Sequence, residues 1–178
     1  MVQYPHMFLA PRKQIRLPPD EYIGTAISFI TICCENRLAI FQDASRSNAA
    51  IAILRRASQS MQFLVHAFCL MPDHVHLLLE GTAAGSDLVR FVAQWKQQTG
   101  YLFRHELPKR FWQRRFYDHI LRGGEGAESV AWYIWMNPVR KGIVAEPHQY
   151  PFSGSLTAEW PNVSAPAKLW NPPWKTQS

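Results

Sequence analysis

The sequence predicts an α+β fold with a ferredoxin-like (split β-α-β) antiparallel sheet, helices on one face and the other face free for a ligand. Segments with the periodicity of strands and helices follow in the order strand, helix, strand, strand, helix, strand, which is the split β-α-β order. The 178 residues are enough for one domain with a sizeable core. The composition, with 47% hydrophobic and 18% charged residues, is that of a globular chain and excludes general disorder.

The first half of this order contains a strand, a helix and a hairpin. Residues 26–35 are rich in Ile, Phe and Thr and predict the first strand. Residues 48–64 place apolar side chains at helical spacing and predict the first helix. Residues 65–71 and 74–80 predict two strands, and a tight turn that contains Pro72 joins them into a hairpin.

The second half adds two helices and a strand. Ser86 is the expected N-cap of a helix over residues 88–102. Residues 111–121 are aromatic and predict the fourth strand, after which a glycine-rich stretch interrupts the chain. A third helix, C-terminal to the sheet, is predicted over residues 128–136. It should end near Asn137, because the residue before a proline resists helical geometry.

The two ends of the chain differ in composition from this core. Residues 1–20 combine prolines with basic residues and predict a basic arm without regular structure. Residues 21–155 hold the predicted domain. Residues 156–178 are rich in proline and tryptophan and predict an extended or disordered tail.

The cysteines and the apolar runs indicate a cytoplasmic protein. The three cysteines have no C-x-x-C spacing, and an odd number argues against a disulfide framework, so a reducing compartment is expected. The best apolar run, residues 26–34, is too short to span a bilayer. The N-terminus has no signal-peptide layout, so no membrane partner is expected.

Charge points to a polyanionic partner, nucleic acid before membrane. The net charge is +6 and the pI is about 9.5, although a merely solvated basic surface would give the same totals. Residues 104–122 carry six basic side chains against two acids, with aromatic residues between them, and form the best candidate for a DNA-backbone patch. The six are Arg104, Lys109, Arg110, Arg114, Arg115 and Arg122.

His74 and His76 are the strongest candidates for metal ligands. In a strand, residues i and i+2 point the same way, so both imidazoles share one face while Val75 packs into a core. Tyr133 and Asn137 lie four residues apart, on one face of the third helix. Two neutral imidazoles and the Asn137 carbonyl oxygen make a mixed site that suits Mg²⁺ or Mn²⁺ when phosphate oxygens complete the shell.

Each of these residues also has a structural interpretation. The histidines fit a surface or a hydrogen-bonded core, and Zn²⁺ is a further possible ion, although no cysteine is placed to close a tetrahedral site. Tyr133 fits either a nucleophile that leaves a phosphotyrosine or a helix tyrosine half-buried against the sheet. His119 fits proton transfer, a phosphate contact or a structural strand histidine.

Several motifs together resemble those of the single-tyrosine HUH transposases, and most closely the REP-associated tyrosine transposases. The resemblance covers most of the chain. It is specific because the motifs occur in the family's order and spacing. They are Gly24-Thr25 with Phe29-Ile30-Thr31 and Asn36-Arg37, Leu70-Met71-Pro72-Asp73-His74-Val75-His76, the aromatic-basic run 111–120, Tyr133-Ile134-Trp135-Met136-Asn137-Pro138-Val139-Arg140-Lys141-Gly142, and Tyr150-Pro151-Phe152-Ser153.

The resemblance implies a metal-dependent DNA strand transferase. Tyr133 would attack a phosphodiester of single-stranded DNA near a hairpin, giving a 5′-phosphotyrosine and a free 3′-OH, with His74, His76 and Asn137 holding a divalent cation. Gly24 and Thr25 belong to the region that would contact bases beside the hairpin. A monomer is favoured over the dimer of insertion-sequence enzymes.

Two other functions stay open from the sequence. One is a catalytically silent protein that binds a DNA hairpin with the same fold, and the other is a metal-dependent nuclease that uses a metal-bound water. The chain also departs from the family at Trp135 and Met136, where relatives often carry polar residues.

Overall fold

The computed structural model describes residues 18–108, 110–159 and 163–173, so most of the predicted basic arm lies outside the described residues. The helices and strands of the described chain are η1 Pro19–Tyr22, β1 Ile27–Cys33, η2 Glu35–Arg37, η3 Ile40–Gln42, α1 Ala44–Ser60, β2 Phe63–Met71, β3 His74–Gly81, α2 Leu88–Leu102, β4 Tyr117–Ile120, α3 Ala127–Trp135, α4 Asn137–Arg140, η4 Pro147–Gln149 and β5 Ser153–Gly154.

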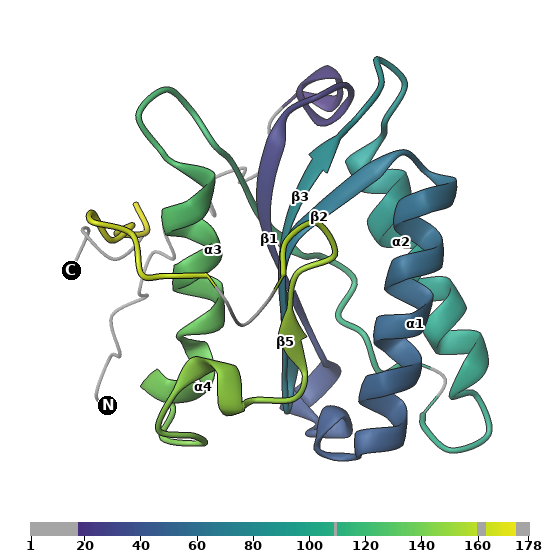
Figure 1. The fold of residues 1–178 in the computed structure, drawn as a ribbon. Coiled ribbons are helices and arrows are strands. Elements are labelled where there is room, and N and C mark those ends of the chain that lie inside the picture. Colours follow the sequence, from purple (N-terminus) through teal and green to yellow (C-terminus); the bar gives the residue numbers. More distant parts are fainter. Residues whose placement is uncertain (1–17, 109, 160–162, 174–178) are drawn as a thin grey trace, which may run out of the picture.

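The strands form one five-stranded antiparallel sheet in the order β4-β1-β3-β2-β5. The elements from β1 to β4 follow the predicted split β-α-β order, and β5 extends the sheet beside β2. Helices α1 and α2 cover one face, as Figure 1 shows. Helix α3 packs on the other face, against β2 and β3, so the expectation that all helices share one face is wrong.

Alternation along β3 separates two hydrophobic cores. Val75, Leu77 and Leu79 are fully buried in the larger core beneath α1 and α2. Leu78 points to the opposite face and is buried beneath α3. Full burial of one such side chain contributes about 1.5 to 3 kcal/mol, so a shift of register by one residue would exchange the two faces at a large cost.

The predicted strand over residues 111–121 is wrong in its first half. Phe111 and Trp112 are both buried in the larger core, and Trp112 donates from Nε1 to Thr99 Oγ1 at 2.9 Å. Because two neighbouring aromatic side chains enter the same core, this part of the chain does not alternate as a strand does. Regular pairing with β1 begins only at Tyr117.

Two helices begin at aspartates that the sequence pattern did not single out. Asp43 caps α1, and Asp87 rather than Ser86 caps α2, each by accepting the backbone N–H three residues ahead. Ser86 is buried, and its hydroxyl donates to the Gln62 carbonyl oxygen at 2.9 Å. Its side chain therefore anchors the loop after β3 to the backbone at Gln62.

Two glycines hold the backbone where another residue would strain it. A Cβ on Gly81 would lie 1.9 Å from the Gly24 carbonyl oxygen, so the end of β3 and the chain before β1 approach too closely for any side chain. Gly142 has φ +67° and donates to the Val139 carbonyl oxygen at 2.9 Å, which ends α4.

The C-terminal motif fastens α3 to the sheet. Tyr150 donates its hydroxyl to the Leu70 carbonyl oxygen at 2.7 Å. Trp135 is buried and donates from Nε1 to the Gly154 carbonyl oxygen of β5 at 2.9 Å. The tryptophan that departs from the family pattern thus packs into the core of this face. Within the described residues, no helix combines the length and the apolar character that a bilayer crossing requires.

Candidate active site

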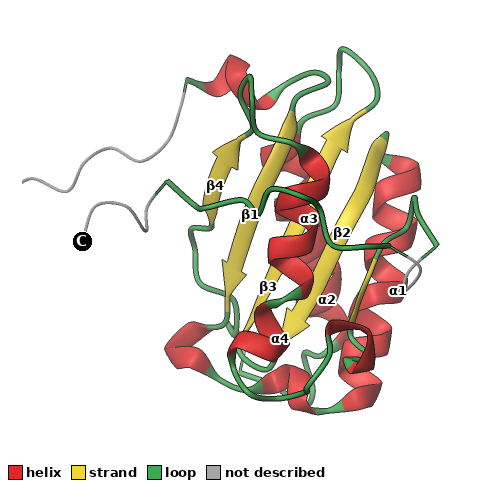
Figure 2. Ribbon diagram, turned by 60° about the vertical axis from the view of Figure 1, so that its left-hand side comes forward, coloured by secondary structure: helices red, strands yellow, loops and turns green. Residues whose placement is uncertain are grey.

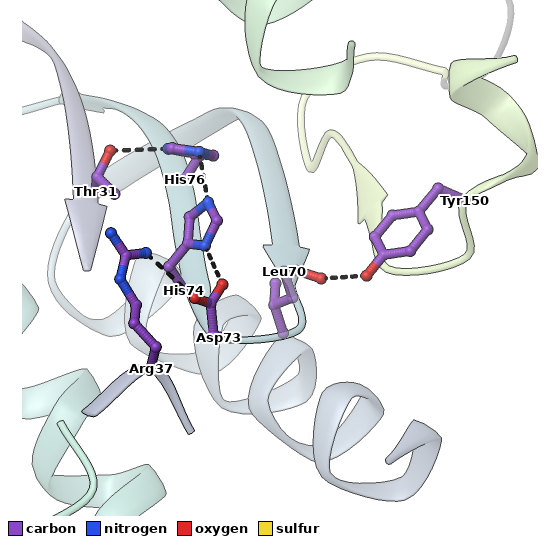
Figure 3. Close-up of polar contacts among 7 residues, drawn as sticks. All are labelled: Thr31, Arg37, Leu70, Asp73, His74, His76 and Tyr150. Carbon is purple, nitrogen blue, oxygen red and sulfur yellow. Dashed lines mark hydrogen bonds and ion pairs between the residues drawn. The ribbon is translucent and has the colours of Figure 1, made fainter. Parts of the chain in front are cut away.

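The two histidines of β3 meet on the sheet face that α3 covers. Val75, between them, points into the opposite core, as strand alternation predicts. The Nε2 atoms of His74 and His76 lie 3.1 Å apart, and Figure 3 shows the rings turned toward each other. His76 is only 8% exposed. The pair is therefore a preformed arrangement of two nitrogens at the end of the sheet.

Each imidazole also makes a polar contact through its Nδ1 atom, on the side of the ring away from the pair. His74 Nδ1 lies 2.5 Å from Asp73 Oδ1, and Arg37 in turn contacts Asp73 at 3.3 Å. His76 Nδ1 lies 2.8 Å from Thr31 Oγ1, and Thr31 is directly opposite His76 in the β1–β3 pairing. Partners of this kind fix the orientation of a metal-binding imidazole and its tautomer.

Burial keeps both imidazoles neutral. It lowers the pKa of His74 against the opposing effect of Asp73, and it lowers the pKa of His76 well below the usual value, with the charges of His74 and Arg140 adding to the effect. A carboxylate at Nδ1 requires a proton there, so His74 carries its lone pair on Nε2. The Thr31 hydroxyl donates or accepts, so His76 can present either a proton or a lone pair to His74.

The geometry of the pair fits a divalent cation. With metal–nitrogen distances of about 2.1 Å, two nitrogens 3.1 Å apart subtend about 95° at the ion, which is nearer an octahedral than a tetrahedral angle. In the described part of the chain, no three His, Cys, Asp or Glu side chains gather into a cluster that could hold a metal. Amide oxygens, water and substrate oxygens are groups that can complete the shell of such an ion.

Asn137 lies at the start of α4, which packs against β2. Its amide nitrogen donates to the carbonyl oxygens of Tyr133 at 3.2 Å and Ile134 at 2.9 Å. These bonds leave the amide oxygen as the group for a cation. The role of Asn137 as third ligand remains a prediction.

Tyr133 packs against the same face of the sheet. The Phe29 ring contacts both Tyr133 and the histidine pair, with its centroid 5.6 Å from that of His76 and 6.2 Å from that of Tyr133. The Arg140 guanidinium carbon lies 4.1 Å from the centroid of the Tyr133 ring, and Arg140 donates to the Tyr133 carbonyl oxygen at 2.9 Å. Tyr133 therefore sits beside a fixed positive charge, which suits a group that meets a phosphate.

A second tyrosine shares this face. Tyr117 of β4 is paired with Thr31 of β1, so its side chain also points toward α3. Burial, followed by the charge of Asp118, raises the pKa of Tyr117 to about 12, which makes its hydroxyl harder to ionise. His119 lies two residues on, and its Nε2 is 2.9 Å from both carboxylate oxygens of Glu125.

The predicted DNA-binding residues fall at two ends of the sheet. Arg104, Arg110, Arg114 and Arg115 are exposed near the C-terminal end of α2 and the entry to β4, at the end that holds His74. Gly24, Thr25 and Arg122 lie at the opposite end, where Arg122 contacts Glu21 at 3.2 Å. Lys109 lies outside the described residues.

Several residues of the site escaped the sequence reasoning. Asp73 follows Pro72 in the predicted turn, and a carboxylate directly before a His-x-His pair is a signal for a histidine partner. Thr31 and Arg140 lie within the motifs that resemble the transposase family, but their contacts with His76 and Tyr133 depend on strand pairing and on the turn from α3 into α4, and Glu125 carries no local signal. Trp170 of the predicted tail also reaches this face, where it contacts Tyr133.

The chain is similar to proteins of one transposase family. A family model described as "Transposase IS200 like" matches residues 26–137. A REP-associated tyrosine transposase from Escherichia coli K12 is 26% identical over 133 residues, covering 74% of this chain and 78% of that protein. A Haemophilus influenzae protein provisionally given the same name is 27% identical over 135 residues, covering 64% of this chain and 74% of that protein.

A solved structure shows the same fold. It is a REP-associated tyrosine transposase bound to a REP hairpin, and it matches with a TM-score of 0.64 at 22% identity, covering 86% of this chain and 82% of that one.

Proposed function

Because the chain belongs to the family of IS200-like transposases, we propose that it cleaves and rejoins single-stranded DNA beside a hairpin, using Tyr133 as nucleophile. The observation that carries the proposal is the pair of Nε2 atoms 3.1 Å apart on the sheet face where Tyr133 lies. The names of the relatives and the hairpin in the matched structure support this DNA class. The basic segment near α2 supports a polyanionic substrate.

His74, His76 and the Asn137 amide oxygen would hold one divalent cation, Mg²⁺ or Mn²⁺. When bound, the cation makes the phosphorus more electrophilic and offsets the charge that develops on its oxygens. Thr31 and Asp73 hold the imidazoles in place for it. Arg140, beside the Tyr133 ring, attracts the phosphate to the nucleophile.

In the proposed step the Tyr133 oxygen attacks phosphorus and forms a P–O bond. The bond from phosphorus to the 3′-oxygen of the preceding nucleotide breaks, and that oxygen leaves as a 3′-OH after it takes up a proton. The tyrosine proton passes to a base. We propose His119 for this role, because its position on β4 directs its imidazole to the same face of the sheet. The 3′-OH can reverse the step on another phosphotyrosine, so joining needs no nucleotide energy source.

The test is denaturing-gel detection of a covalent complex between the protein and a labelled hairpin oligonucleotide from beside its own gene. Samples contain Mg²⁺, Mn²⁺ or EDTA. We expect an adduct that requires a divalent cation and disappears in Tyr133→Phe, with DNA binding retained because the change removes a single hydroxyl. Tyr117→Phe is the matched control, since Tyr117 lies on the same face but has a raised pKa.

The outcomes separate the functions left open by the sequence. An adduct in Tyr133→Phe that is absent in Tyr117→Phe would move the nucleophile to Tyr117. Cleavage without any adduct would point to a nuclease that uses a metal-bound water, and tight binding without cleavage to a silent hairpin-binding protein. Full activity in the double variant His74→Ala/His76→Ala would exclude the proposed metal site.

A further inference from the structure

Trp170 fills a recess on the sheet face that carries the histidine pair. Aromatic rings from three elements line it: Phe29 of β1, His119 of β4 and Tyr133 of α3. The indole centroid lies 5.4 Å from that of Phe29, 5.9 Å from that of His119 and 5.1 Å from that of Tyr133. Phe29 and His119 are paired directly across β1 and β4, so both rings must point to this face. The recess therefore holds a flat two-ring group against aromatic walls.

The recess has one polar edge, formed by Glu125. Trp170 donates from Nε1 to Glu125 Oε1 at 2.8 Å. The carboxylate is held by other groups as well, because Oε2 accepts the Arg122 backbone N–H at 2.9 Å and His119 Nε2 lies 2.9 Å from both oxygens. Burial raises the pKa of Glu125, but the hydrogen bonds from Arg122, Trp170 and His119 together lower it, so the acceptor is ionised.

We propose that this recess binds one unpaired purine of the DNA substrate, beside the phosphodiester that Tyr133 attacks, and that Trp170 occupies the purine's place in the free protein. The inference rests on the proposed function. An indole and a purine are both fused five- and six-membered rings with N–H donors on the edge. Proteins hold unstacked bases between aromatic rings and identify them by hydrogen bonds at the edge, which is what this recess offers.

The segment that carries Trp170 is suited to exchange. Residues 163–173 have no regular secondary structure, and Figure 2 shows the C-terminal segment crossing α3. Leu169 is 64% exposed and Asn171 is exposed as well, whereas Trp170 and Val163 pack against the core of this face and Pro172 is buried. The walls, by contrast, belong to the regular elements β1, β4 and α3.

A purine fits better than a pyrimidine, because a single ring would leave part of the indole's space empty. The base would also bring its own phosphate to Tyr133, whose ring already has the Arg140 guanidinium 4.1 Å from its centroid. A base bound in the recess would thus fix the position of the cleaved bond along the strand. The recess would then contribute to the choice of cleavage site.

The test measures binding of a labelled hairpin oligonucleotide by fluorescence anisotropy. Every protein carries Tyr133→Phe, which keeps the ring of the recess and prevents covalent trapping. The oligonucleotides lack one base at each unpaired position in turn, and a second series exchanges purine and pyrimidine. Trp170→Ala is compared with Leu169→Ala, a matched change of the neighbouring exposed residue.

We expect Trp170→Ala to bind the intact oligonucleotide about tenfold more tightly, because the base no longer competes with the indole, whereas Leu169→Ala binds like its parent. In Trp170→Ala, removal of the base at one purine position should weaken binding about tenfold, and Glu125→Gln should reduce that penalty at this position alone. Equal binding by the Trp170→Ala and Leu169→Ala proteins, or no position sensitive to base loss, would overturn the proposal.

The covalent-adduct assay distinguishes this failure from that of the proposed function. An adduct that forms without any base-sensitive position would leave the tyrosine mechanism standing and remove the purine site. A base-sensitive position without an adduct would leave the purine site standing and remove the tyrosine mechanism.

Discussion

Thr31 lies directly opposite His76 in the β1–β3 pairing, and its Oγ1 is 2.8 Å from His76 Nδ1. Its hydroxyl can donate to Nδ1 or accept from it, so it supports both tautomers of that imidazole. A cation between the two Nε2 atoms requires the tautomer in which Nδ1 carries the proton. Thr31 should therefore contribute to metal affinity without touching the metal.

Thr31→Val keeps the shape of the side chain and removes the hydroxyl. We expect the Mn²⁺ concentration needed for half-maximal adduct formation to rise at least tenfold, because His76 loses the partner that orients it. Thr82→Val is the control, since Thr82 bonds the distant Gln62 carbonyl oxygen. An unchanged Mn²⁺ requirement in Thr31→Val would show that His76 is held without Thr31.

At the scale of elements, α2 and the segment 110–115 make one basic surface. Lys96 of α2 donates from Nζ to the carbonyl oxygens of Gln113 at 2.5 Å and Arg114 at 3.2 Å. An open cavity of about 500 Å³ lies between α2 and residues 110–114, and Arg110 and Arg114 are among the residues that line it. The Gln113 backbone N–H donates to the Cys33 carbonyl oxygen, and Cys33 lies opposite His74 in the β1–β3 pairing. The surface thus adjoins the end of the sheet that holds the histidines.

We predict that the triple change Arg110→Gln, Arg114→Gln and Arg115→Gln weakens hairpin binding. The slope of log K against log salt should become shallower by about one for each phosphate that the protein no longer neutralises. The sequence of the oligonucleotide should matter little, because phosphate contacts carry no base information. The control is Arg55→Gln with Arg56→Gln on the exposed side of α1. A slope that the triple change leaves unaltered would place the DNA surface elsewhere.

At the scale of the whole molecule, the two faces of the sheet differ: one packs against the larger hydrophobic core, and the other carries the candidate active site. The larger core under α1 and α2 holds one face rigid, and Trp95 at its centre is fully buried and donates to the Ala50 carbonyl oxygen at 3.2 Å. The other face collects the histidine pair, Tyr133 and Trp170 from segments far apart in the sequence. A ligand bound there joins β1, β3 and α3, so it should stabilise the entire fold.

Thermal unfolding should therefore report on the metal site. At a free Mn²⁺ concentration about 100 times its dissociation constant, binding stabilises the native state by about 2.7 kcal/mol. In a domain of this size that corresponds to a rise in Tm of about 5 to 10 °C. His74→Ala/His76→Ala should lose the rise, and EDTA should abolish it in the unaltered protein. A rise that persists in the double variant would mean that Mn²⁺ binds at another site.

The local pattern of the chain determined the order of elements, the shared face of the two histidines and the basic segment. These follow from periods of two and 3.6 residues and from the short-range steric rule at Pro138. The same reasoning misplaced the start of β4, because tertiary packing drew Phe111 and Trp112 into one core. It also placed all helices on one face, since hydrophobic periodicity does not say which face a helix covers.

Only the tertiary structure decided what surrounds the site. The contact of Thr31 with His76 depends on the β1–β3 register, and that of Arg140 with Tyr133 on the turn from α3 into α4. Trp170 and Phe29 are 141 positions apart in the chain, yet their rings meet on one face. The contacts of Thr31 and Trp170 join distant parts of the chain and result from the balance of burial over the whole sheet, so no short window of sequence contains them.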